Sequence, residues 1–305
     1  MKMFNKKWFS PLLAVFLSLF LISCDSGSDD ERKPVPRKVT EQKVEKGQEC
    51  AHLSPWGFPQ FNPPQANTRF LCHSGYALEF NPRSKTPMWV VEHLTRQNLA
   101  VKVASRQDDF RPDPDLPEDV SAKLSDYVGS GFDRGHMAPA EDFRGNAKQM
   151  SESFYLSNMI PQDPNNNRGI WAQLEKVTRY WAVSYNEVYV ITGPIYQGGS
   201  SLGFLGHSDQ VRLMGVEQGG RGLDTVKKGR IAIPTHIYKV IYAPKFNQAI
   251  GFIIPNSPAN VKDLPKYRVP VSTVEYYTGL SFFPQWPATN VPVKSQIPLW
   301  PIKTK

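Results

Sequence analysis

The stretch Gly129-Ser-Gly-Phe-Asp-Arg-Gly-His-Met-Ala-Pro139 is the part of this 305-residue chain on which the fold prediction depends. Two later stretches belong to the same region, Asn158-Met-Ile-Pro-Gln162 and Asn165-Asn-Asn-Arg-Gly-Ile-Trp-Ala-Gln-Leu-Glu175. Together they supply an imidazole, guanidinium groups, side-chain amides and carboxylates. Such groups can accept a proton, bind a phosphate and hold a hydrated cation. We therefore take this region as the candidate functional site.

Cleavage of a phosphodiester bond would give the first stretch a chemical role. The reaction needs a base to activate water, positive charge on the phosphoryl oxygens and a group that stabilises the departing oxygen. His136 titrates near neutral pH and can take a proton from water. If this piece is extended, Arg134 lies on the same face as His136 and can hold the phosphate. Gly135 between them allows a backbone to approach closely.

Asn167 and Glu175 fit the sparse ligand set of a hydrated Mg²⁺, which prefers oxygen ligands and keeps most of its waters. On a continuous α-helix, Asn167, Trp171 and Glu175 span an arc of about 80°. The two polar residues would then be about 12 Å apart along the axis, too far for both to bind one ion directly. We therefore predict Asn167 as a direct ligand and Glu175 as a water-mediated one.

Each of these residues has an ordinary explanation when it is taken singly. His136 could be a satisfied surface or core histidine, and Asp133 with Arg134 could be an ion pair. Asn167 could cap the helix, and Glu175 could be a solvated helix charge. Only the combination favours a catalytic site.

The combination resembles the DNA/RNA non-specific endonuclease family, and Gly129–His136 is especially similar to endonuclease G. The resemblance includes the spacing from Asn158 to Asn167 and on to Glu175, and it covers most of residues 70 to 285. It implies an α+β fold of the ββα-metal, or His-Me finger, type. It also implies hydrolysis of DNA and RNA without strong sequence specificity.

The resemblance implies a role for each residue of the site. His136 is the general base, and Arg134 contacts the scissile phosphate. Asn167 is the one protein ligand of a hydrated Mg²⁺, or of Mn²⁺ in its place, and Glu175 holds the water shell of the ion. Asn158 supports the geometry of the site.

A second arginine of the family lies upstream, in a segment like Arg106-Gln-Asp-Asp-Phe-Arg111. We assign this role, a second contact with the phosphate, to Arg106, with Arg111 as the competing choice.

The secondary structure expected from the residues alone agrees with an α+β fold. An apolar stripe at helical spacing predicts a helix through Ile170, Leu174, Val177 and Trp181. A shorter helix is predicted after Asn146, with Gln149 completing a partial capping box. Stretches rich in β-branched and aromatic residues predict strands at residues 88–92, 100–104, 187–192, 236–242 and 249–254.

The N-terminal residues predict export and a lipid anchor. Residues 1–23 combine lysines with a short apolar run, which is typical of a secretory signal. The segment ends at Cys24 as in a bacterial lipoprotein, and the alternative is an ordinary signal with an incidental cysteine. Residues 24–49 are predicted to be the lipidated Cys24 and a flexible tether, and residues 50–305 the endonuclease domain. The expected location is the periplasmic face or the surface of a bacterial membrane.

Cys50 and Cys72 remain as a pair, and we expect a disulfide between them in an exported chain. The alternative is two free, buried thiols.

The predicted function is metal-dependent endonuclease activity. The whole chain has a formal net charge of +8, and residues 50–305, with 27 Lys and Arg and 21 Asp and Glu, are formally +6, which suits a phosphate backbone. Many exported proteins are equally basic, so the charge does not decide the matter. One alternative is a membrane-tethered protein that captures nucleic acid without cutting it. Another is a phosphodiesterase with a different substrate. The sequence leaves open the preference for DNA or RNA, a homodimer, an inhibitor protein and the role of residues 285–305.

Overall fold

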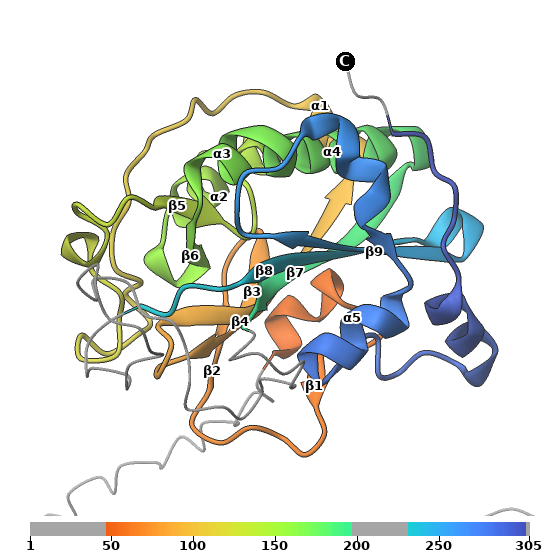
Figure 1. The fold of residues 1–305 in the computed structure, drawn as a ribbon, viewed down its shortest axis with the longest axis horizontal. Coiled ribbons are helices and arrows are strands. Elements are labelled where there is room, and N and C mark those ends of the chain that lie inside the picture. Colours follow the sequence, from red (N-terminus) through yellow and green to blue (C-terminus); the bar gives the residue numbers. More distant parts are fainter. Residues whose placement is uncertain (1–46, 197–230, 303–305) are drawn as a thin grey trace, which may run out of the picture. The chain divides into compact units, whose positions relative to one another are not determined.

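An antiparallel sheet is the centre of the fold, and helices cover both of its faces (Figure 1). The computed structural model describes residues 47–196 and 231–302, which belong to a unit that runs from Val44 to Lys305. Among the described residues, seven strands lie in the order β10-β9-β8-β7-β4-β3-β2, each antiparallel to its neighbour.

The strands of this sheet and of two small two-stranded sheets are β1 (Gln60–Phe61), β2 (Arg69–Cys72), β3 (Tyr76–Asn81), β4 (Thr86–Thr95), β5 (Asp133–His136), β6 (Met159–Gln162), β7 (Glu187–Ile195), β8 (His236–Ala243), β9 (Gln248–Pro255), β10 (Arg268–Val269) and β11 (Leu280–Ser281). The α-helices are α1 (Arg96–Ala100), α2 (Ala147–Glu152), α3 (Pro164–Asn166), α4 (Ala172–Tyr185) and α5 (Val271–Thr278). Short 3-10 helices are η1 (Gln48–Leu53), η2 (Leu124–Asp126), η3 (Ala140–Phe143), η4 (Leu156–Asn158), η6 (Pro244–Phe246), η7 (Val261–Tyr267) and η8 (Ala288–Ser295), and η5 (Asn167–Trp171) is a π-helical turn.

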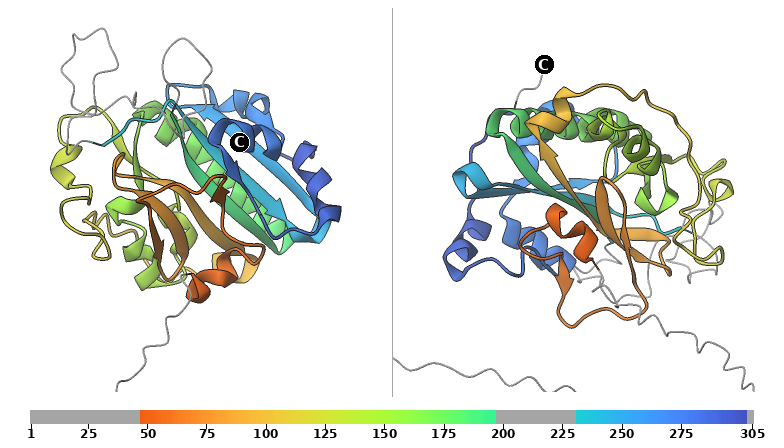
Figure 2. Two further views of the ribbon diagram at one scale, coloured as in Figure 1. Left: turned by 90° about the horizontal axis from the view of Figure 1, so that it is seen from below. Right: turned by 180° about the vertical axis from the view of Figure 1, so that it is seen from behind.

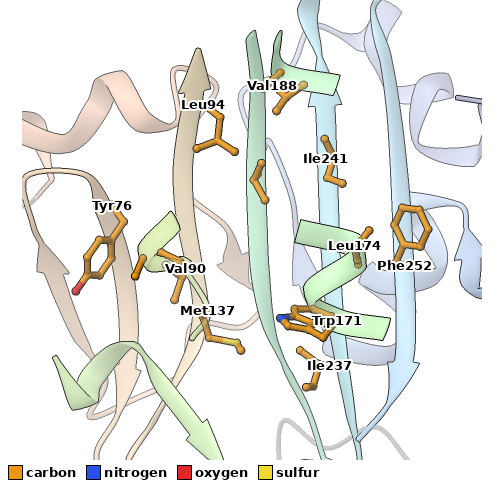
Figure 3. Close-up of a cluster of buried hydrophobic side chains, with 14 of the residues drawn as sticks. Tyr76, Val90, Leu94, Met137, Trp171, Leu174, Val188, Ile237, Ile241 and Phe252 are labelled. Atoms are coloured by element: carbon orange, nitrogen blue, oxygen red, sulfur yellow. The ribbon is translucent and has the colours of Figure 1, made fainter. Parts of the chain in front are cut away.

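The two faces of the sheet bury separate apolar clusters because successive side chains of a strand point to opposite faces. In β4, Val90 and Leu94 pack in the cluster that contains the buried residues of α4. Trp89 and Val91 pack in the cluster that contains Val271 and Val274 of α5. Figure 3 shows the first cluster, where α4 lies on the strands, and Figure 2 shows the helices on either side of the sheet from two further directions.

Four of the five predicted strands are confirmed as parts of β4, β7, β8 and β9. The prediction for residues 100–104 is wrong, because Ala100 ends α1 and the following residues form a loop. The backbone amides of Val103 and Ala104 both donate to the carbonyl of Arg144, so this segment joins another loop instead of a strand. The prediction relied on the β-branched residues Val101 and Val103, which lie in this loop.

Both predicted helices are present. Leu174, Val177 and Trp181 are buried along α4, and Ile170 is buried in the turn before it. Asn146 caps α2, because its side chain accepts hydrogen bonds from the backbone amides of Lys148 and Gln149 at 2.9 and 3.2 Å. The Gln149 side chain donates instead to the Ser74 carbonyl, so the predicted capping box is not completed.

The β5–β6 pair and the helical segment after it form the predicted ββα unit. Arg134 lies opposite Pro161 and His136 opposite Met159 in the register of the two strands. At Gly135 the close approach is to a side chain, since a Cβ there would lie 2.0 Å from Oε1 of Gln162. Glycine is therefore required at this position for β6 to pair as it does.

A disulfide joins Cys50 of η1 to Cys72 of β2, as predicted. The predicted signal, the lipidation site Cys24 and the tether up to residue 46 lie outside the described residues. Among the residues that are described, no helix has the length and apolar character needed to cross a bilayer.

The last described residues pack on α4 and β9 through Trp300, so for residues 285–302 the structure shows packing against the domain. Trp300 is 4% exposed, its ring lies 5.1 Å from that of Trp181, and its indole N–H donates to Oε1 of Gln248 at 2.8 Å. The Trp181 indole N–H donates to the carbonyl of Pro301 at 2.9 Å. Trp300 is thus part of the core.

Replacing Trp300 with Ala should therefore lower the free energy of unfolding by about 3–5 kcal/mol, because it empties a buried aromatic site. Its neighbour Leu299 is 86% exposed and provides the matched control. Leu299→Ala should change stability by less than about 0.5 kcal/mol. Urea denaturation of both variants measures the difference, and equal stabilities would show that the segment does not stabilise the core.

Candidate active site

Arg134 and His136 lie on one face of β5, as the spacing predicted, and both meet the ring of Phe110. The guanidinium carbon of Arg134 lies 4.0 Å from the centroid of the Phe110 ring. The imidazole of His136 lies 5.6 Å from the same centroid. Phe110 therefore supports both side chains, and the sequence analysis had not singled it out.

His136 is 8% exposed and is held between aromatic rings. The Phe154 ring stands edge-on to the imidazole at 5.1 Å, and Nε2 has no hydrogen-bond partner among the described residues. Burial, together with the nearby positive charges of Arg106 and Arg134, lowers the pKa of His136 to about 3. The imidazole is therefore neutral at physiological pH and can accept a proton.

Asn158 fastens the chain just beyond His136. Its Oδ1 accepts a hydrogen bond from the backbone N–H of Ala138, and its Nδ2 donates to the carbonyls of Ala138 and Ser153, all at 2.9 Å. The Asn158 side chain is completely buried, so it is a positioning residue that does not meet solvent.

A cavity of about 570 Å³ opens beside these residues. Polar and charged side chains that line it include Arg106, Asp133, Arg134, Asn167 and Arg168. His136, Asn158 and Glu175 are not among its lining residues. Nevertheless the charge of Arg106 acts on both His136 and Glu175, although burial has the larger effect on the pKa of each group.

The choice between Arg106 and Arg111 favours Arg106. The Arg106 guanidinium lies 5.0 Å from the Phe154 ring, and its ion pair with Asp108 is exposed. Arg111 does not line the cavity and is occupied by Asp109 and by the hydroxyl and carbonyl of Ser151. Arg111 therefore holds the loop to α2, and Arg106 faces the cavity.

Asp133 anchors the metal-ligand candidate instead of pairing with Arg134. Its carboxylate accepts hydrogen bonds from Arg168 at 2.6 and 2.9 Å and from Nδ2 of Asn167 at 2.9 Å. The side chain of Asn167 does not cap a helix N-terminus, because Asp163 is the N-cap of α3 and Asn167 follows its last residue. Asn167 lines the cavity, and its amide oxygen remains available as a metal ligand.

The helix between Asn167 and Glu175 is not continuous, and the predicted arc of about 80° is therefore wrong. Residues Asn167–Trp171 form a π-helical turn in which Gly169 has φ −108° and ψ −106°. Glu175 lies in the first turn of α4. Burial raises the pKa of Glu175 to about 7, although Arg179 and Lys239 oppose the shift.

A second set of possible metal ligands was not predicted. His73, Asp113 and Asp115 place ligand atoms within 4.8 Å of one another. However, His73 is hydrogen-bonded to Asp113 at 2.9 Å, and Ser157 also donates to that carboxylate. None of the three lines the cavity. We therefore interpret His73 and Asp113 as a buried link between β2–β3 and η4, with Asp115 exposed beside them, and no local sequence pattern signals it.

The β5–β6 pair, the helical segment after it and the His136 site define a protein of the ββα-metal nuclease class. The chain belongs to the DNA/RNA non-specific endonuclease family, whose model matches residues 58–289. The predicted family and fold are thus confirmed.

Several relatives match most of this chain in sequence, and one solved structure matches its fold. The chain is 36% identical over 239 residues to mitochondrial nuclease EXOG of Xenopus laevis, which covers 76% of this chain and 62% of EXOG. It is 35% identical to human mitochondrial endonuclease G, covering 68% of this chain and 67% of that one. A crystal structure of an EndoG/EndoGI complex, which concerns the mechanism of EndoG inhibition, matches with a TM-score of 0.66 and 32% identity over 79% of this chain and 94% of that one. The chain thus spans less than two thirds of EXOG and nearly all of the EndoG chain in that structure.

These relatives correct the predicted location. We expected an exported protein, lipid-anchored to a bacterial membrane. The EXOG nucleases of Xenopus laevis and Homo sapiens are mitochondrial, as are the matching nucleases of Schizosaccharomyces pombe and Saccharomyces cerevisiae. The prediction depended only on the first residues of the chain, whose apolar run and single cysteine are a short and common pattern.

The low pKa of His136 predicts how stability depends on pH. The folded pKa of about 3 lies below the unfolded value of about 6.5, so the stability from this neutral imidazole is present above pH 6.5 and is lost as pH falls toward 3. His136→Gln should remove this loss, which is about 2 kcal/mol between pH 7 and pH 5. Urea denaturation at both pH values measures it, with exposed His52→Gln as the control. The same pH dependence in wild type and His136→Gln would contradict the prediction.

Proposed function

We propose that this protein is a metal-dependent endonuclease that hydrolyses phosphodiester bonds of DNA and RNA without strong sequence specificity. One observation carries the proposal. A buried, neutral His136 and the guanidinium of Arg134 share one face of β5, beside a cavity lined by Arg106 and Asn167. These are the groups that phosphodiester hydrolysis needs.

Arg134 and Arg106 would bind the scissile phosphate. A guanidinium group presents several N–H donors in one plane and can hold two phosphate oxygens at once. Arg134 rests on the Phe110 ring and Arg106 on the Phe154 ring, so one face of each guanidinium is occupied. Nε of Arg106 donates to the exposed carboxylate of Asp108, and the terminal nitrogens of Arg106 would contact the phosphate. Both groups are thus oriented before the substrate arrives.

His136 would take the proton of the attacking water. With a pKa of about 3 it is a weak base in the free protein. A phosphodiester between Arg106 and Arg134 adds negative charge that opposes the effect of the arginines, and so raises the pKa of His136 toward neutrality. A base with a pKa closer to the operating pH is a more effective proton acceptor.

Asn167 fits a hydrated Mg²⁺ or Mn²⁺. Asp133 holds the amide nitrogen of Asn167, which leaves its oxygen for a cation that needs few protein ligands. A bound divalent ion supplies positive charge that stabilises the departing 3′ oxygen. The carboxylate of Glu175 would hold the water shell, and Asn158 keeps the backbone after His136 in place. The products would carry a 5′ phosphate and a 3′ hydroxyl.

Contacts to phosphate explain the proposed lack of sequence specificity, because the phosphate backbone is the same at every base. A protein that only captured nucleic acid would need the positive charge but not the buried, neutral imidazole. The related EndoG forms a complex with EndoGI, and an inhibitor protein for this chain stays a prediction, as does a homodimer.

The experiment that tests the proposal is a plasmid-nicking and RNA-degradation assay with Mg²⁺, with chelator and with His136→Ala. We expect metal-dependent cleavage of both polymers, and loss of at least about 100-fold in rate without the base. His52→Ala is the control, because His52 is exposed and outside the site. Full activity of His136→Ala would overturn the assignment, and salt-sensitive binding by a wild type that does not cleave would favour capture.

Asn167→Ala should raise the Mg²⁺ concentration needed for half-maximal activity, because it removes the proposed ligand oxygen. A shift of about 10-fold or more is expected for loss of a direct contact. Asn165→Ala is the matched control, since the same side chain is removed from an exposed position two residues away. An unchanged metal titration in Asn167→Ala would contradict the ligand role.

A further inference from the structure

The cavity beside the active site has a part that the proposed chemistry does not use. Besides the arginines and Asn167, its lining contains apolar and aromatic side chains from the loop that leads into β5. We call these the apolar wall, and they are Leu124, Tyr127, Val128 and Phe132.

The apolar wall is open to the solvent of the cavity. Leu124 is 40% exposed and Val128 is 82% exposed, although both are large apolar side chains. Phe132 is half-buried and packs on the cluster that contains Leu156 and Met159. A supported phenyl ring with exposed apolar neighbours is a surface on which a flat, apolar group can stack.

Tyr127 adds a polar group to this wall. Its side chain is 6% exposed, and its buried hydroxyl has no hydrogen-bond partner among the described residues. A buried hydroxyl without a partner is costly, and a ligand would reach this one only with a shift of the Tyr127 side chain. The wall as it stands therefore suits a group that is flat and apolar on its face.

The position of the wall relative to the arginines identifies the ligand. Phe132 directly precedes β5 and lies two residues before Arg134, and both side chains line the cavity. Two residues of extended chain span about 6.6 Å, so the two backbone positions are no further apart than a length comparable to the reach from a phosphate to its own base. A nucleotide whose phosphate lies on Arg134 thus brings its base to the apolar wall.

We propose that the apolar wall is a nucleobase subsite, in which the base next to the scissile phosphate stacks on Phe132 beside Val128 and Tyr127. The inference rests on the proposed nuclease function and specifies its substrate. Stacking on an aromatic ring accepts any base, so the subsite is consistent with sequence-independent cleavage. A base can enter only after it has left a duplex stack, so the preferred substrate is a single strand or an unstacked nucleotide.

The test compares two small ligands in the presence of chelator, so that binding is separated from cleavage. They are thymidine 3′,5′-bisphosphate and the same sugar bisphosphate without a base. Isothermal titration calorimetry measures both affinities for the full-length wild type and for Phe132→Leu, which keeps apolar volume but removes the ring. Val128→Ser tests the exposed part of the wall, and Val291→Ser, at a residue that is 53% exposed and does not line the cavity, is its matched control.

The wild type should bind the thymidine ligand about 5- to 150-fold more tightly than the base-free one, which is the range for one base stacked on an aromatic ring. Phe132→Leu should reduce this ratio by about fivefold or more, Val128→Ser should reduce it less, and Val291→Ser should leave it unchanged. If a variant loses the preference for the thymidine ligand but keeps its affinity for the base-free ligand, the substitution has removed the subsite and has not unfolded the protein.

Equal binding of both ligands by a wild type that cleaves DNA and RNA would overturn the subsite and leave the nuclease function intact. No detectable binding of either ligand by such a protein would also overturn it. A wild type that binds the thymidine ligand with the expected ratio but cleaves neither polymer would refute the nuclease function and retain the nucleotide site. The two failures are therefore distinct.

Discussion

The antiparallel pairing of β5 with β6 is the constraint on which the site depends. The pairing makes the Asp-Arg-Gly-His segment extended, so that Arg134 and His136 share a face. It requires a glycine at position 135, because a Cβ there would collide with the Gln162 side chain. Asn158 at the start of β6 then fastens the chain after His136, and the helical segment after β6 carries Asn167 and Glu175.

Aromatic rings beside β5 determine the electrostatic environment of the site. Phe110 and Phe154 exclude water from His136 while their faces carry Arg134 and Arg106. Low polarity and nearby positive charge both disfavour a protonated imidazole, so the same contacts that hold the cations keep the base neutral. In the proposed mechanism, the arginines bind an anion, and the negative charge of that anion raises the pKa of His136 so that it can accept a proton.

The fold and the family agree, yet the relatives changed the interpretation of where the protein acts. The family model covers the sheet, the ββα unit and the helices packed on them. The first residues of the chain lie outside both this match and the described structure. A pattern of lysines, an apolar run and one cysteine therefore had no packing or pairing to test it, and the mitochondrial relatives overturned it.

The sequence alone determined the parts of this protein that follow local rules. Several features arise from residues that are close in the chain. They are the apolar spacing in α4, the cap of α2 at Asn146, four strands of the sheet and the alternation that places Arg134 and His136 on one face of β5. Only the tertiary structure decided that residues 100–104 form a loop, that Asp133 binds Arg168 and Asn167, and that Phe110 lies beneath Arg134. It also placed the π-helical turn before α4. The physical reason is that periodicity is set by the backbone of one segment, whereas ion pairs and ring contacts depend on which distant segments packing brings together.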